Sequence, residues 1–299
     1  MGRGSRHFFL VCSVAYFLLQ AGSARAMAAG ITHPPYMQIA DGLVALSQAV
    51  PGWAVTIDYG VTPEGRPLRA LRLADPRSAA QRQRPAVLIT GSTHGDEYLH
   101  IEDRLAGWFL SHRDGGGGVA RFFAAGGVLL LVPVVNPDGF EAQKRNNSHD
   151  VDVNRDFAQP LQGISGFMEP ESRALARWLA AEVATLDLAL RMTLDYHCCS
   201  GALLFPKSVS SDGVLSAEAQ SFAAIGRMMP QDIDATYHYG SSDKLLGYTA
   251  DGTSKDYFHE TYGSLSFTFE GRYRSEAGRF IQHTQWWDRV LALLVAASG

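Results

Sequence analysis

The sequence predicts an α/β protein with one domain, a mixed, mainly parallel twisted sheet and helices on both of its faces. Short apolar runs typical of buried strands alternate along the chain with longer amphipathic segments, a pattern that favours such a layered sheet. The 299 residues are 46% hydrophobic and 19% charged, an ordinary globular composition. No internal repeat or long linker divides the chain, so we expect a single domain over residues 27–299.

The first 26 residues are expected to be a secretory signal. Arg3 and Arg6 precede the short apolar run "HFFLVCSVAYFLL", and Ala24 and Ala26 have the spacing of a signal-peptidase site. A membrane anchor is the alternative interpretation, but the run is too short for a stable span. We therefore expect a secreted or periplasmic protein with no membrane span after cleavage.

Charge and cysteine content argue against a nucleic-acid-binding protein and against a disulfide-rich scaffold. The expected mature chain keeps 23 basic and 30 acidic residues, a formal net charge of −7, and shows no basic footprint for nucleic acid. Its two cysteines, Cys198 and Cys199, are adjacent and cannot join distant segments. They are either packing residues or a strained vicinal disulfide, and core packing must supply the stability.

The elements in the first half of the chain follow from periodicity and turn signals. An amphipathic helix is expected at 36–50, then two strands at 54–60 and 66–74 around the turn "TPEG". The apolar run 85–90 is typical of a buried strand. A helix from about Glu97 to His112 is expected to follow it.

The second half continues the alternation. The run 126–135 is expected to be a buried strand that ends at the turn signal "NPDG". The remaining expected elements are helices at 169–186, 216–229 and 276–298 and strands at 188–197 and 265–271.

Several candidate metal ligands lie where predicted strands end, the usual place for a ligand in an open α/β sheet. His94 and Glu97 are three residues apart after the strand at 85–90, and zinc sites use such spacing. A surface histidine beside an acid would also explain this pair. His197 directly follows another strand and could be the third ligand or a core histidine bonded to backbone.

Glu270 lies at the end of the last predicted strand, where a carboxylate is costly unless it is paired or functional. A zinc hydrolase needs such a carboxylate as a general base near the metal. Alternatively, Glu270 has no catalytic role and pairs with Arg272, which lies two residues further along on the same strand face.

Eight short motifs in fixed order resemble the zinc metallocarboxypeptidase family of carboxypeptidase A/B type. They extend over roughly residues 36–285 and are "GVTPEGRPLRALRL", "HGDE", "NPDGF", "DVNRDF", "EPES", "DYHCCS", "LGYTADGTSKDYF" and "FTFEGR". The resemblance implies a carboxypeptidase-like fold, one zinc ion per chain, and peptide substrates with a free C-terminal carboxylate. We expect no long inhibitory pro-segment between the signal and this region.

The resemblance also implies roles for individual residues. Zinc would be bound by His94, Glu97 and His197, with Glu270 activating the water and later protonating the leaving amine. Arg145 resembles the arginine that stabilises the oxyanion. The other implied roles are carboxylate capture by Asn154 and Arg155, closure over the substrate by Tyr248, and orientation of the first zinc histidine by Asp152.

By the same resemblance Lys255, seven residues after Tyr248, would lie at the position that sets the preference for the C-terminal side chain. A lysine there should favour a carboxylate-bearing group, such as Glu, Asp or diaminopimelate. Alternatively, Lys255 bends out to solvent, or Asp243 or Asp256 neutralises it.

Three other functions remain open from sequence. One is a murein-peptide amidase that cleaves the γ-D-glutamyl–diaminopimelate bond, another a deacylase of acyl-amino acids, and the last a zinc-bearing peptide-binding protein without catalysis. His100 has ligand-like spacing, but a third ligand from the same helix would lie about 5 Å further along the axis. We interpret His100 as a helix-packing residue or one that supports a ligand, and expect Asp96 to point away from the metal.

Overall fold

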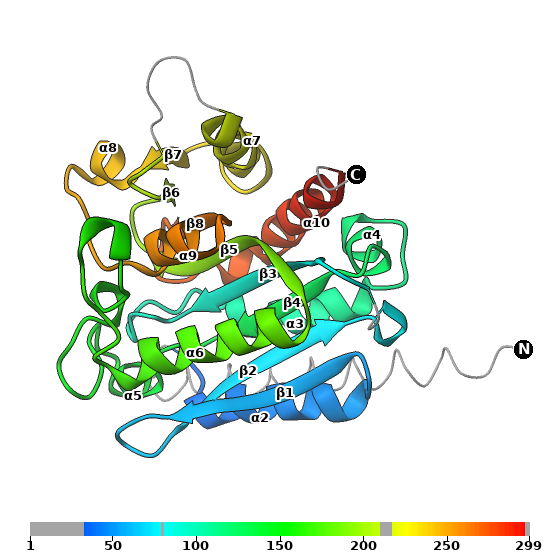
Figure 1. Cartoon of the computed structure of the whole chain (residues 1–299), viewed down its shortest axis with the longest axis horizontal. Helices are drawn as coiled ribbons and strands as arrows, with labels where there is room; N and C mark the ends of the chain where they lie inside the picture. Colours follow the sequence, from blue (N-terminus) through cyan, green and yellow to red (C-terminus); the bar gives the residue numbers. More distant parts are fainter. Residues whose placement is uncertain (1–32, 79–80, 210–216, 297–299) are drawn as a thin grey trace, which may run out of the picture.

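The computed structural model describes residues 33–78, 81–209 and 217–296 (Figure 1). The expected signal at 1–26 lies outside the described residues. One eight-stranded sheet runs through the molecule in the order β1-β2-β4-β3-β5-β8-β6-β7. Its strands are β1 (Ala54–Val61), β2 (Pro67–Ala74), β3 (Arg84–Gly91), β4 (Val128–Val132), β5 (Leu188–Cys198), β6 (Ala202–Phe205), β7 (His238–Ser241) and β8 (Leu265–Gly271).

The sheet is mixed, with a parallel centre. Strands β4, β3, β5 and β8 pair in parallel, whereas β1–β2, β2–β4 and β6–β8 pair antiparallel. The carboxyl ends of β3, β5 and β8 therefore meet at one edge of the sheet, and this edge carries the candidate ligands. The predicted mixed, mainly parallel α/β fold is confirmed.

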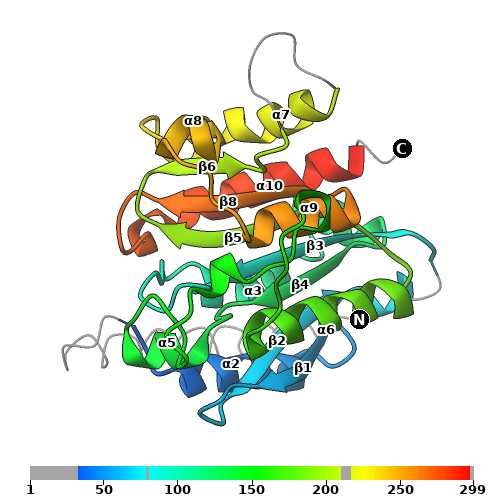
Figure 2. The same ribbon diagram turned by 60° about the vertical axis from the view of Figure 1, so that its left-hand side comes forward.

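Helices cover both faces of the sheet (Figures 1 and 2). Alternate residues of β3 belong to opposite cores: Val87 and Ile89 pack on one side, Ala86 and Leu88 on the other. The first face is covered by α2 (Tyr36–Ala49), α3 (Glu102–Ser111), α4 (Gly118–Ala124), α7 (Ala217–Asp232) and α10 (Phe280–Ala296). The second is covered by α6 (Pro170–Thr185) and α9 (Ser254–Tyr262), while α5 (Pro137–Ala142) and α8 (Ser242–Leu246) are short helices at the periphery.

One predicted helix begins later than expected. The helix expected at 97–112 starts at Glu102, so His94, Glu97 and His100 lie in a loop. His100 adopts a left-handed backbone with φ 63°, which a helix cannot accommodate. The Glu102 carboxylate accepts hydrogen bonds from the backbone N–H groups of Leu99 and Ile101, which stabilises this loop.

Several short elements were not predicted, namely α4, α5, β6, β7, α8 and α9. The motif "NPDG" forms the start of α5 instead of a simple turn, and the Asn136 side chain caps it by accepting from Gly139 N. The most consequential omission is α9, because this helix carries Lys255. Among the described residues, no helix combines the length and apolar character needed to cross a membrane.

His283 on α10 makes the stability of this fold sensitive to acid. Its ring packs on Tyr196 and Phe269, both ring nitrogens lack a partner among the described residues, and burial lowers its pKa to about 3. An unfolded histidine titrates near 6.5, so below that pH the unfolded state binds more protons and stability falls until about pH 3.

We expect His283→Leu to remove about 2 kcal/mol of the stability loss that occurs between pH 6.5 and pH 5. Urea unfolding at the two pH values measures this difference. The exposed His238 provides a control, because His238→Leu should keep the wild-type dependence. Equal acid sensitivity in wild type and His283→Leu would contradict the assignment.

Candidate active site

The candidate site is a pocket of about 300 Å³ at the carboxyl ends of β3, β5 and β8. His94 follows β3 through a short turn, and His197 near the end of β5 is the register partner of Glu270 on β8. The pocket brings together nearly all the side chains that the sequence nominated. Its lining includes His94, Glu97, Arg145, Asn154, Arg155, Tyr248, Lys255 and Glu270.

His94, Glu97 and His197 converge as a metal site would require. The Glu97 Oε2 atom lies 3.0 Å from His94 Nδ1 and 2.9 Å from His197 Nδ1, and the two Nδ1 atoms are 3.0 Å apart. All three residues are buried. Among the described residues, they form the one group of histidine, cysteine or acidic side chains with ligand atoms close enough to share an ion.

The outer nitrogen of each histidine faces a carboxylate. His94 Nε2 lies 3.0 Å from Asp152 Oδ1, and His197 Nε2 lies 2.9 Å from Asp195 Oδ2. A histidine that donates from Nε2 keeps Nδ1 free for a metal, and such carboxylates fix the ring orientation of ligating histidines.

The donor set fits zinc. Two imidazole nitrogens and one carboxylate are ligands that zinc prefers, and a catalytic zinc site uses three protein ligands with an open fourth position. Because two unprotonated Nδ1 atoms and a carboxylate oxygen would otherwise repel at these separations, a cation between them would stabilise the arrangement.

Glu270 is free of the alternative partner considered from sequence. Arg272 donates to Thr236 O instead, at 2.6 Å. Burial raises the pKa of Glu270 to about 7. A carboxylate beside the metal ligands with such a pKa can both accept and release a proton near neutral pH.

Arg145 reaches into the same site from the loop after α5. Its Nη1 lies 3.1 Å from His94 Nδ1 and 3.2 Å from Glu97 Oε1, and its Nη2 donates to Asp152 Oδ2 at 2.9 Å. The Arg145 side chain is 44% exposed, which leaves it open to a ligand in the pocket.

Asn154 and Arg155 lie side by side at the pocket wall. Asn154 is fixed by Ser254 N, which donates to its Oδ1 at 3.0 Å, so its Nδ2 amide faces His197 at 3.3 Å. Arg155 donates to the backbone oxygen of Asn154 at 2.8 Å and not to its neighbour Asp156. The Asp156 carboxylate instead accepts from Met168 N, Glu169 N and Ser172 Oγ.

Lys255 is buried, only 2% exposed, and does not bend out to solvent. Its Nζ donates to Thr253 Oγ1 at 3.1 Å and to Asp256 Oδ2 at 2.6 Å, so Asp256 is the acid that pairs with it, one of the alternatives that the sequence left open. Burial lowers the pKa of Lys255, and Asp256 partly offsets this shift. Tyr248 also lines the pocket but, unlike the buried Lys255, it is 53% exposed.

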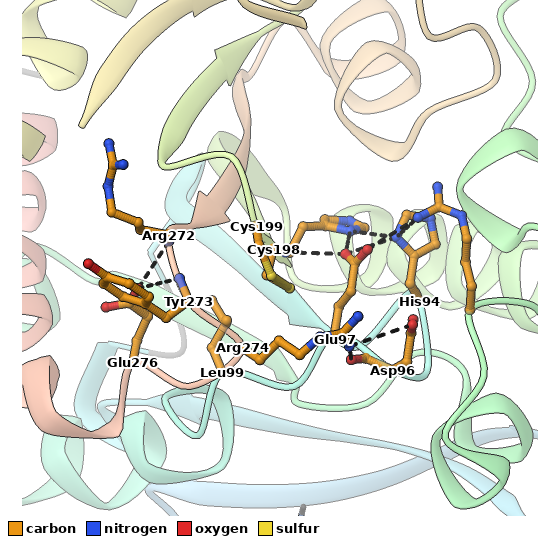
Figure 3. Close-up of a disulfide and its surroundings, with 12 residues drawn as sticks. His94, Asp96, Glu97, Leu99, Cys198, Cys199, Arg272, Tyr273, Arg274 and Glu276 are labelled. Atoms are coloured by element: carbon orange, nitrogen blue, oxygen red, sulfur yellow. Dashed lines mark hydrogen bonds and ion pairs between the residues drawn. A yellow bond between two sulfur atoms is a disulfide. The ribbon is translucent and has the colours of Figure 1, made fainter. Parts of the chain in front are cut away.

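The residues around the metal ligands are drawn in Figure 3. Cys198 and Cys199 form a disulfide, so their interpretation as free packing residues is wrong. Cys198 N donates to Glu97 Oε2 at 3.2 Å and thus helps to hold this carboxylate. Asp96 lies outside the metal group, and its backbone oxygen accepts from Arg274 at 3.0 Å.

His100 is likewise outside this group, and its ring packs on Tyr98 with 4.6 Å between centroids. The prediction that it stands on the helix is wrong. The residue that sequence reasoning missed is Asp195. Its position two residues before His197 on one strand was an available signal, since residues i and i+2 share a face.

The chain belongs to the zinc carboxypeptidase family, whose sequence pattern matches residues 39–286. The fold and the zinc-compatible His94–Glu97–His197 group agree with this membership.

Individual relatives fit the same class. The chain is 34% identical over 127 residues to carboxypeptidase SOL1 of Arabidopsis thaliana, covering 40% of this chain and 25% of that protein. It is 24% identical over 274 residues to carboxypeptidase B of Helicoverpa zea, covering 75% and 59%. The chain thus spans less than two thirds of either relative. The solved carboxypeptidase A of Helicoverpa armigera shares its fold, with a TM-score of 0.68, 21% identity and 96% and 80% coverage.

Proposed function

We propose that the protein is a zinc-dependent exopeptidase that hydrolyses the C-terminal peptide bond of peptide substrates. The observation that carries the proposal is the presence, in one pocket, of a metal-ligand group, an acid–base carboxylate and cationic groups for a substrate carboxylate. Zinc held by His94, Glu97 and His197 would acidify a water molecule and polarise the scissile carbonyl.

The other side chains of the pocket would supply proton transfer, stabilisation of the oxyanion and binding of the substrate. Glu270 takes a proton from the attacking water and delivers it to the leaving amine, as its pKa near neutrality permits. Arg145 stabilises the negative charge that develops on the carbonyl oxygen. Asn154 and Arg155 bind the terminal carboxylate, for which a planar guanidinium is well suited, and the exposed Tyr248 closes over the bound peptide.

Lys255 would set the preference for the C-terminal side chain. Of the three N–H groups on Nζ, two face acceptors among the described residues, and one is left for a ligand. A buried ammonium with a lowered pKa gains from a carboxylate ligand more than an exposed one would, because the local dielectric constant is low. We therefore propose a preference for C-terminal Glu or Asp.

The same feature favours a second candidate substrate, a murein peptide that ends in diaminopimelate. This residue carries an additional carboxylate on its side chain, which Lys255 could bind while Asn154 and Arg155 hold the main-chain carboxylate. Cleavage of γ-D-glutamyl–diaminopimelate in murein tripeptide, compared with cleavage of an ordinary peptide ending in Glu, distinguishes the two. With residues 1–26 as a signal, we propose a secreted or periplasmic enzyme.

We expect the wild-type protein to hydrolyse peptides ending in Glu faster than those ending in Leu or Lys. Lys255→Met should reduce the ratio of kcat/KM for Glu over Leu by at least about 30-fold, the effect of losing about 2 kcal/mol from a buried charge pair. Kinetics with matched acyl-dipeptides measure this ratio.

Lys207 provides the matched control, because its ammonium pairs with Asp251 at 2.5 Å and it is absent from the pocket lining. Lys207→Met should leave the Glu-to-Leu ratio within about threefold of wild type, because its ion pair is with the exposed Asp251 and such pairs contribute little. A wild-type enzyme with no preference for Glu would contradict the role of Lys255 without affecting the proposed exopeptidase activity.

A further inference from the structure

Asp195 is a fully buried carboxylate at which three segments of the site meet. It is 3% exposed and lies on β5, two residues before His197. Its Oδ1 accepts from Thr90 Oγ1 at 2.8 Å and from Thr93 Oγ1 at 3.0 Å. Its Oδ2 accepts from Ser254 Oγ at 2.9 Å and lies 2.9 Å from His197 Nε2.

These partners belong to different parts of the active site. Thr93 immediately precedes the metal ligand His94, and Ser254 is the first residue of α9, next to Lys255. A single carboxylate therefore links the turn that carries one histidine, the strand that carries the other, and the helix that carries the specificity residue.

The neighbourhood of His197 Nε2 determines the direction of its hydrogen bond. The other polar group close to this nitrogen is Asn154 Nδ2, at 3.3 Å, and its identity as nitrogen follows from the bond that Ser254 N donates to Asn154 Oδ1. An amide nitrogen only donates, so it cannot accept the Nε2 proton. Asp195 Oδ2 is the acceptor, and His197 Nδ1 is left to face Glu97 and a metal.

We propose that Asp195 is a positioning residue for the metal site, with the same effect on His197 that Asp152 has on His94. It holds the proton on Nε2, orients the ring, and fixes the metal-binding group relative to α9. The inference rests on the proposed zinc site. Loss of the carboxylate that accepts from the outer nitrogen of a ligating histidine typically lowers metal affinity 10- to 100-fold.

The test uses the full chain with Asp195→Asn, a substitution of nearly the same shape that removes the anionic acceptor. Zinc affinity is measured by competition with a chromophoric chelator. In parallel, proton NMR of the zinc-loaded protein labelled with ¹⁵N-histidine detects the Nε2–H of His197. A hydrogen bond to a carboxylate should shift this proton strongly downfield and slow its exchange in wild type.

Two controls separate positioning from general structural damage. Ser254→Ala removes one contact to Asp195 but keeps the carboxylate that accepts from His197, so it should lose less zinc affinity than Asp195→Asn does. Asp75→Asn neutralises another buried carboxylate, one that pairs with Arg77 directly after β2. It should lower stability and leave zinc affinity unchanged.

A 10- to 100-fold loss of zinc affinity in Asp195→Asn, together with loss of the downfield proton, would support the inference. Affinity within threefold of wild type, or a downfield signal that persists in the variant, would overturn it. If Asp195→Asn does not fold, the wild-type spectrum decides: absence of a downfield His197 Nε2–H overturns the assignment.

Failure of the proposed function gives a different result. A chain that binds zinc through His197 and loses affinity in Asp195→Asn, yet cleaves no peptide, contradicts the exopeptidase and supports the positioning role. A chain that cleaves peptides while Asp195→Asn keeps full zinc affinity contradicts only the positioning role.

Discussion

Glu270→Gln is expected to reduce kcat for peptide hydrolysis by about 10²- to 10⁴-fold, the usual contribution of a general acid–base group. The amide has nearly the shape of the carboxylate but cannot take a proton from water or return it to the leaving amine. Because Glu270 is outside the metal-ligand group, the variant should bind zinc as wild type does. Steady-state kinetics and metal analysis of the same preparation measure both quantities.

Glu182→Gln is a suitable control for this result. Glu182 lies on α6, remote from the pocket lining, and pairs with Arg72 at 2.7 Å. This control should keep wild-type kcat. A Glu270→Gln protein with more than about a tenth of wild-type activity would contradict the acid–base role. Inert wild-type protein with a full zinc content would instead indicate a binding protein without catalysis.

His197→Ala is expected to strip zinc from the protein, whereas His100→Ala should retain it. His197 Nδ1 lies with His94 and Glu97 in the metal-ligand group, so its loss leaves two ligands where a catalytic zinc site needs three. His100 packs on Tyr98 in the loop before α3. Zinc content after dialysis against a weak chelator, measured by atomic absorption, compares the two variants.

The two histidine variants also control for each other, because each removes one imidazole from the vicinity of the β3–α3 loop. Retention of one zinc per chain in His197→Ala, with loss in His100→Ala, would reverse the ligand assignment. Loss in both would mean that the loop conformation, rather than His197 alone, determines binding.

The parts of the fold that the sequence predicted are those with a strong local signal. The apolar runs of β3, β4 and β5 are long enough and apolar enough to indicate buried strands without any tertiary information. Helix α9 could not be predicted in this way, because "SKDYFHETY" is polar and short. Its first turn is fixed by contacts of Ser254 with Asn154 and Asp195, which are distant in sequence.

The candidate site likewise has features that a local sequence signal predicts and features that depend on tertiary contacts. His197 and Glu270 lie at the ends of β5 and β8, and His94 and Glu97 lie in the loop that follows β3, so their convergence follows from parallel topology once the strands are recognised. The late start of α3 depends on the Glu102 side chain and the left-handed His100, for which periodicity carries no signal. Single-sequence reasoning likewise cannot find the convergence of Thr90, Thr93, Ser254 and His197 on one carboxylate, because it arises only in three dimensions.

The most direct test of the account is a peptide-library digest read by mass spectrometry, with murein tripeptide included and with zinc removed and restored. We predict release of single residues from the C-terminus, faster for Glu or Asp ends, loss of activity on chelation, and recovery with one equivalent of zinc. Cleavage at internal bonds, or C-terminal release that persists after complete removal of the metal, would contradict it.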